Sequence, residues 1–153
     1  MSAEERLSAL GLTLPEPPKA VASYIPAAVT GSTVYVSGQV PFKDGALTRT
    51  GLVGRDVDLD DAVADARVCA INVLAHLRAA AGGSLDRVVR MVKVTVFVAS
   101  SEGFHAQPQV ANGASDLFVE VFGDAGRHAR AAIGVAALPL GATVEVEAIA
   151  ELS

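Results

Sequence analysis

The segment from Ala142 to Glu151 alternates between two kinds of side chain. One set is small and apolar and consists of Val144, Val146, Ala148 and Ala150. The other set includes two acids and consists of Thr143, Glu145, Glu147 and Ile149. Successive side chains of a β-strand point to opposite faces of its sheet, so this period of two predicts a strand with one buried face. The rest of the chain must therefore cover one side of a sheet, and the other side is left to water or to a partner.

Two longer segments have the spacing of amphipathic helices that could provide this cover. Apolar residues recur every three or four positions from Leu59 to Ala81, with Asp58 as a plausible N-cap, and a second helix is expected from Pro108 to Phe122. A short helix is expected at Ala3–Leu10, followed by an extended, proline-containing segment over Thr13–Val21. Two helices of this kind can cover only one face of a sheet.

The remaining strands are predicted from runs rich in β-branched residues. A hairpin is expected around Thr30–Ser32, with its second strand ended by Gly38, and a long strand covers Val88–Val98. Another strand is expected at Arg130–Val135, whereas the glycine-containing segment Lys43–Val57 is predicted to be a loop. The order is β-β-α-β-α-β-β, an α+β fold with a mixed sheet and two helices on one face.

Composition and charge exclude several classes of function. The 153 residues are 51% hydrophobic and 19% charged, which suits one domain whose remaining apolar surface faces another subunit. A net charge of −5 with only 12 basic residues argues against nucleic-acid binding. The first residues are acidic, unlike a signal peptide, and the longest uncharged run, Ala131–Val144, is broken by Pro139 and Gly141. We expect a soluble, cytoplasmic protein that does not enter membranes.

The residue types that bind metals or act as nucleophiles are sparse and scattered. His76, His105 and His128 lack ligand-like spacing and are interpreted as ordinary surface or helix-end residues. The single cysteine, Cys69, lies within a helical pattern with no adjacent base and is expected to be buried and inert. These residues therefore predict no metal site.

Arg130 is the only basic residue after His128, and it begins a run of small apolar residues. A guanidinium is costly to bury unpaired, and its planar shape matches a carboxylate or a phosphate. Two interpretations follow from the residues alone: an internal ion pair with Glu145 or Glu147 on the next strand, or a site for an anionic ligand. Structural ion pairs are common in proteins, so the residues alone do not decide between the ion pair and the ligand site.

Three motifs together resemble a known family. VYVSGQVP (Val34–Pro41), VTVFV (Val94–Val98) and ARAAIGVAALPLGATVEVEAIA (Ala129–Ala150) are similar to segments of the reactive-intermediate deaminase family, known as RidA or YjgF. The resemblance covers Ala20–Glu151, which suggests an N-terminal helical extension at residues 1–19 and a RidA-like domain at residues 20–153. It implies the chorismate-mutase-like fold, assembled as a homotrimer around a central barrel with pockets between subunits.

The resemblance also implies an activity that needs no cofactor. Family members with the arginine hydrolyse short-lived enamine and imine acids, such as 2-aminoacrylate and 2-iminopropionate, to 2-keto acids and ammonia. By position, Arg130 would bind the substrate carboxylate and Glu145 would position the attacking water. The other positions implied to line the pocket are Tyr24, Ser37, Gly38, Asn112 and Ala132.

The chain departs from the family pattern at several positions. Ala132 replaces a cysteine that is common in the family, and Ile25 and Pro26 replace a usual Ser-Gln pair. A trimer that binds small acids without catalysis, as a regulator, is the alternative to the deaminase. The role of endoribonuclease or translation inhibitor, also associated with the family, is less favoured because the chain is acidic.

Overall fold

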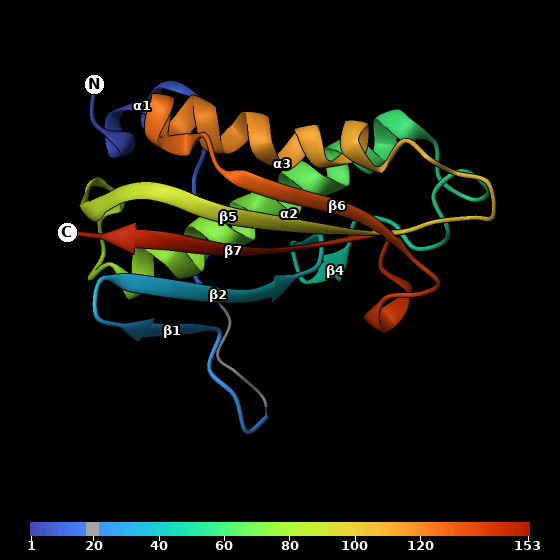
Figure 1. The fold of residues 1–153 in the computed structure, drawn as a ribbon, viewed down its shortest axis with the longest axis horizontal. Helices are drawn as coiled ribbons and strands as arrows, with labels where there is room; N and C mark the ends of the chain where they lie inside the picture. The colour runs from blue at the N-terminus through green and yellow to red at the C-terminus, as the bar shows by residue number, and fades with distance from the viewer. Residues whose placement is uncertain (18–21) are drawn as a thin grey trace.

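Five strands form one mixed sheet in the computed structural model, which describes residues 1–17 and 22–153 (Figure 1). The strand order is β1-β2-β7-β5-β6, and every neighbouring pair is antiparallel except β5 and β6, which are parallel. The bounds are β1 Ala27–Thr30, β2 Thr33–Gln39, β5 Val88–Ala99, β6 Ala129–Val135 and β7 Val144–Leu152. The α+β class and the mixed sheet predicted from the sequence are confirmed.

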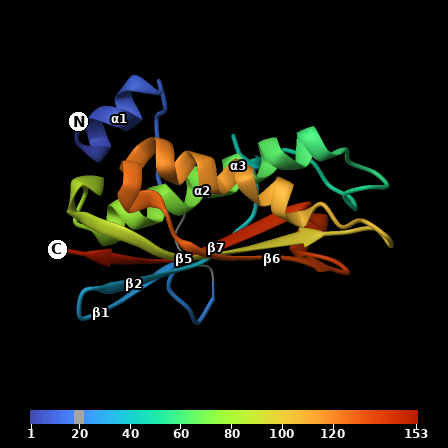
Figure 2. The same cartoon turned by 45° about the horizontal axis from the view of Figure 1, so that its top comes forward.

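The helices lie on one side of this sheet and leave the other side open (Figure 2). Their bounds are α1 Ala3–Ala9, α2 Leu59–Ala80 and α3 Gln107–Phe122, each within two residues of the prediction. Helix α1 is capped by Ser2 and Glu5 in a capping box and packs against α3. No helix in the described part of the chain is long and apolar enough to span a membrane.

The sequence predictions were wrong in three places. The expected loop after Lys43 contains a small hairpin, β3 Phe42–Lys43 with β4 Ala46–Leu47. Strand β2 does not end at Gly38, because a register shift between Val36 and Gln39 lets it continue through the glycine. His76, interpreted as a surface or helix-end residue, lies within α2 and is only 4% exposed.

One prediction falls partly outside the described residues. Of the segment expected to be extended, Thr13–Pro17 has no helix or strand, whereas residues 18–21 are outside the structure's description. The predicted boundary between residues 19 and 20 lies there as well.

The core forms where the apolar face of β7 meets α2. The alternating set predicted to be buried, Val144, Val146, Ala148 and Ala150, is at most 3% exposed. Small residues also let the two long helices approach closely, because a Cβ added at Gly113 of α3 would overlap the carbonyl oxygen of Val63 in α2. Gly113 therefore fixes the position of α3 over the sheet, and with it the two polar residues on either side, Asn112 and Ser115.

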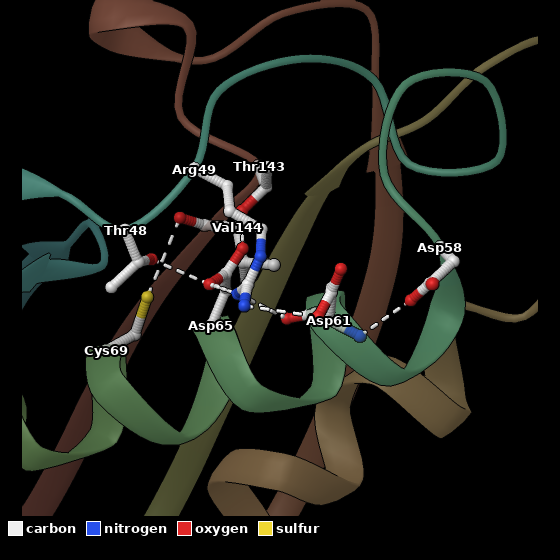
Figure 3. A network of polar contacts seen from close by, with 8 residues as sticks. All are labelled: Thr48, Arg49, Asp58, Asp61, Asp65, Cys69, Thr143 and Val144. Carbon is white, nitrogen blue, oxygen red and sulfur yellow. Dashed lines mark hydrogen bonds and ion pairs between the residues drawn. The ribbon is translucent and has the colours of Figure 1, made fainter.

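A buried carboxylate joins α2 to the start of β7 (Figure 3). Asp65 is fully buried and accepts hydrogen bonds from Thr48 Oγ1 at 2.6 Å, from Thr143 Oγ1 at 2.7 Å and from the guanidinium of Arg49. Buried charges are stable only when they are paired and hydrogen-bonded in this way. The network fixes Thr143, which lies two residues before Glu145.

Candidate active site

Arg130 lies near the start of β6, the strand at one edge of the sheet. Its Nη1 donates to Asn112 Oδ1 at 2.9 Å and to Ser115 Oγ at 3.2 Å, both on the flank of α3. The side chain is exposed, and within the described residues it forms no ion pair. The internal ion pair with Glu145 or Glu147, one of the two interpretations of the sequence, is therefore not formed.

His128 and Ser115 extend the contacts of Arg130 into the protein. His128 Nε2 lies 3.0 Å from Ser115 Oγ, and its Nδ1 lies 2.6 Å from the carbonyl oxygen of Gly126. The ring also meets Phe118 edge to face, with centroids 5.8 Å apart. Burial lowers the pKa of His128, the hydrogen bond to Gly126 opposes this shift and the charge of Arg130 adds to it. Burial therefore favours the neutral form of His128, and this residue, interpreted from the sequence as an ordinary surface or helix-end histidine, belongs to the cluster around Arg130.

Glu145 lies on the open face of the sheet, beside the bulge in β2. A Cβ added at Gly38 would overlap its Oε1, so the glycine makes room for the carboxylate. Burial raises the pKa of Glu145, and the neighbouring charge of Glu147 raises it further. A carboxylate with a raised pKa is a stronger base than an ordinary glutamate, as general base catalysis requires.

The strand register places Arg130 and Glu145 on opposite faces. Arg130 pairs with Val94, whose side chain is fully buried beneath the helices, whereas Glu145 pairs with Phe97. Val94 and Phe97 are three residues apart on one strand, so their side chains point in opposite directions. A single chain therefore cannot bring the guanidinium and the carboxylate together on one small substrate.

The other predicted site residues do not all lie beside Arg130 or Glu145: Asn112 contacts Arg130 and Gly38 adjoins Glu145, but three of the predicted residues share a separate cavity. Tyr24, Ser37 and Gly38 line a cavity of about 730 Å³ beside α2, which Asn72 and His76 also line. Neither Arg130 nor Glu145 lines this cavity. Tyr24 is 55% exposed, so its ring is not a core residue within one chain.

Ala132 occupies the position where the family commonly has cysteine. It pairs with Val96 and packs, half-buried, against the core on the helix side of β6. Its side chain therefore contributes to packing on the same side of the sheet as Arg130.

Ser115 and His128 are the polar contacts that the sequence analysis missed. The available signals were weak: Ser115 follows Asn112 by three positions, which puts both on one side of a helix, and His128 precedes Arg130 by two positions, just before β6 begins. Among the described residues, no group of three or more His, Cys, Asp or Glu side chains is arranged to hold a metal ion.

Comparison with known proteins agrees with the fold and the motifs. The model of the family described as "YjgF/chorismate mutase-like, putative endoribonuclease" matches residues 4–152. The chain belongs to this YjgF family.

Two solved structures are similar over nearly the whole chain. Atu1372 of Agrobacterium tumefaciens, a protein of unknown function, is 47% identical with a TM-score of 0.90, over 98% of this chain and 91% of that one. A protein of Shewanella oneidensis, described as a "putative endoribonuclease", is 34% identical with a TM-score of 0.94, over 99% and 100%.

Among relatives compared by sequence, protein TCP17 of Trypanosoma cruzi is 47% identical over 96% of this chain and 92% of its own. A more distant relative from Rattus norvegicus is named 2-iminobutanoate/2-iminopropanoate deaminase. It is 32% identical over 87% of this chain and 82% of its own.

Proposed function

We propose that this protein is a homotrimeric deaminase that hydrolyses 2-imino acids, and their enamine tautomers, to 2-keto acids and ammonia. The observation that carries the proposal is the state of Arg130, whose exposed guanidinium is held by two neutral oxygens and not by an acid. The positive charge is therefore free to bind the carboxylate of a small ligand. The name of the rat relative supports an imino acid as that ligand.

A trimer would bring Arg130 of one subunit close to Glu145 of the next. Strand β6, with Arg130, lies at one edge of the sheet, and β2, with Gly38, lies near the opposite edge. In a ring of identical subunits, the β6 edge of one chain faces a different part of the next chain. One subunit then supplies Arg130 and Asn112, and its neighbour supplies Glu145, Gly38, Ser37 and Tyr24.

The open face of the sheet supports association. It carries large apolar side chains that stay exposed in the single chain, including Tyr35 at 48% and Ile133 at 45%. Apolar surface of this kind on a small protein marks a contact with a partner. Three such faces around one axis give the central barrel that the family resemblance implies.

The chemistry balances without a cofactor. Arg130 holds the carboxylate, and Glu145 accepts a proton from a water molecule whose oxygen attacks the imine carbon. The nitrogen receives that proton, which gives a neutral carbinolamine. Glu145 then accepts the hydroxyl proton of the carbinolamine and returns it to the amino nitrogen, so that the C–N bond breaks as the C=O bond forms and ammonia and a 2-keto acid leave.

The test is the rate of ammonia release from freshly generated 2-iminopropionate. Wild type is expected to exceed the spontaneous rate, and Arg130→Ala to return to it. Arg127→Ala is the matched control, because Arg127 lies three residues earlier and its guanidinium pairs with the exposed Asp124. Equal rates for wild type, Arg130→Ala and buffer would reject the deaminase. Calorimetric binding of 2-ketobutyrate without turnover would then identify the protein as a non-catalytic binder of small acids.

A further inference from the structure

The hydrogen bonds around Arg130 determine which edge of its guanidinium is available. Nη1 carries two hydrogens, and both are donated, one to Asn112 and one to Ser115. Neither Nε nor Nη2 donates to another residue in the described part of the chain. A guanidinium can bind a carboxylate by two parallel hydrogen bonds only through an edge on which both nitrogens still have a hydrogen to give. The only such edge left is Nε–Nη2.

The proton positions in this cluster follow from the acceptors. A carbonyl oxygen can only accept, so the short contact with Gly126 requires a proton on Nδ1 of His128. In the neutral ring Nε2 then has a lone pair and must accept the hydroxyl proton of Ser115. Because its proton points to His128, Ser115 presents a lone pair to Arg130, as the bond from Nη1 requires.

We propose that Ser115 and His128 are positioning residues for Arg130, which turn its Nε–Nη2 edge toward the substrate carboxylate. This inference rests on the proposed function, because it takes Arg130 as the group that binds the carboxylate. His128 acts through Ser115 by fixing the direction of its hydroxyl. Ser115 acts directly by holding Nη1, so neither residue needs to touch the substrate.

The proposal predicts a specific pattern in the kinetics. Ser115→Ala removes the acceptor from Arg130 and should raise KM for the imino acid about tenfold, with kcat within about threefold. His128→Phe keeps the ring and its contact with Phe118 but removes both nitrogens, and it should raise KM about threefold. Because His128 acts through Ser115, His128→Phe should add nothing in the Ser115→Ala background. Ser115→Thr, which keeps the hydroxyl, should restore KM to near the wild-type value.

Matched controls separate this effect from general damage. Ser8→Ala makes the same change on an exposed helix position, and His105→Phe makes it at an exposed histidine outside the cluster. Both should leave KM unchanged. A readout that needs no variant is the ¹⁵N spectrum of His128, which should show a neutral ring protonated on Nδ1.

The outcomes distinguish this proposal from the proposed function. If Arg130→Ala abolishes turnover but Ser115→Ala has a wild-type KM, the positioning role is wrong and the deaminase stands. The positioning role is also wrong, and the deaminase still stands, if the effects of Ser115→Ala and His128→Phe on KM simply add. The same conclusion follows if His128 is protonated only on Nε2. If wild type neither binds 2-ketobutyrate nor exceeds the spontaneous rate, the proposed function fails, and the inference fails with it.

Discussion

Arg130 and Glu145 project from opposite faces of the same sheet. Their strands lie on either side of β5, and the register pairs Arg130 with Val94 and Glu145 with Phe97. The family resemblance implies that both residues act in the same reaction, with Arg130 binding the substrate carboxylate and Glu145 positioning the attacking water. If both residues act on one substrate, as proposed, they must come from different chains.

Gly38 is expected to be essential for activity but not for folding. A Cβ at this position would overlap the end of the Glu145 side chain, which can move aside, and the backbone of Gly38 is not in the left-handed region. Gly38→Ala should therefore lower kcat/KM by about 10-fold to 100-fold through misplacement of the carboxylate. Its thermal midpoint should stay within about 3 °C of wild type.

Gly31→Ala is the contrasting control for Gly38→Ala. A Cβ at Gly31 would meet no atom within 4 Å, but φ there is +59°, so the cost is backbone strain in the β1–β2 turn. This variant should lose stability and keep its activity per folded molecule. Full activity of Gly38→Ala would show that the position of Glu145 does not matter.

Glu145 is expected to reduce stability at neutral pH. Its pKa in the folded state is raised above the ordinary value of 4.5, so the protonated form is favoured by folding. The stabilisation that protonated Glu145 gives to the folded state is complete below the pKa of this group in the unfolded chain. It is lost as the pH rises through the pKa of Glu145 in the folded state. Glu145→Gln should therefore be more stable than wild type at pH 7, by less than about 1 kcal/mol, with a smaller difference at pH 4.

The same substitution should remove most of the activity. Loss of the base should lower kcat by about 100-fold or more, and wild-type activity should fall as the pH drops through the raised pKa of Glu145. Denaturant unfolding at both pH values, together with a pH–rate profile, tests both effects. A variant that is destabilised at pH 7 and still active would contradict both roles.

Asp65 is expected to contribute more to stability than any surface acid. Asp65→Ala leaves Arg49, Thr48 and Thr143 without their common acceptor and should cost about 2–4 kcal/mol in the free energy of unfolding. Asp61 also pairs with Arg49, at 3.1 Å, but its side chain is 49% exposed, so Asp61→Ala should cost under about 1 kcal/mol. Equal losses in chemical denaturation would mean that the buried network does not hold β7.

The sequence was sufficient to predict the elements whose periodicity is strong. The alternation of β7 and the helical spacing of α2 each arise from one buried face, so they appear in the sequence and persist in the fold. The short hairpin β3–β4 could not be found in this way, because two-residue strands have no period. The sequence predicts a strand end at Gly38, because the bulge that carries β2 past this glycine depends on pairing with β7, a strand far away in the sequence.

The site was less accessible from sequence than the fold. Arg130 stood out because a lone cation in an apolar run is unusual, and the family resemblance implied Asn112, but the second partner, Ser115, lies on a helix 15 positions away and left only a weak signal. The buried position of Asp65 was equally hidden, because an acid near a helix N-terminus is ordinarily solvated. Contacts between distant elements depend on the packing of α3 over β6, which no local pattern encodes.

The most direct test of a site shared between subunits mixes two inactive variants. Arg130→Ala and Glu145→Gln, refolded together in equal amounts, should form trimers in which some interfaces join an intact Arg130 to an intact Glu145. Random assembly makes about one quarter of all sites intact, so about a quarter of wild-type activity should return, while each variant refolded alone stays inactive. If the mixture stays inactive although refolded wild type recovers its activity, Arg130 and Glu145 do not form a shared site between subunits.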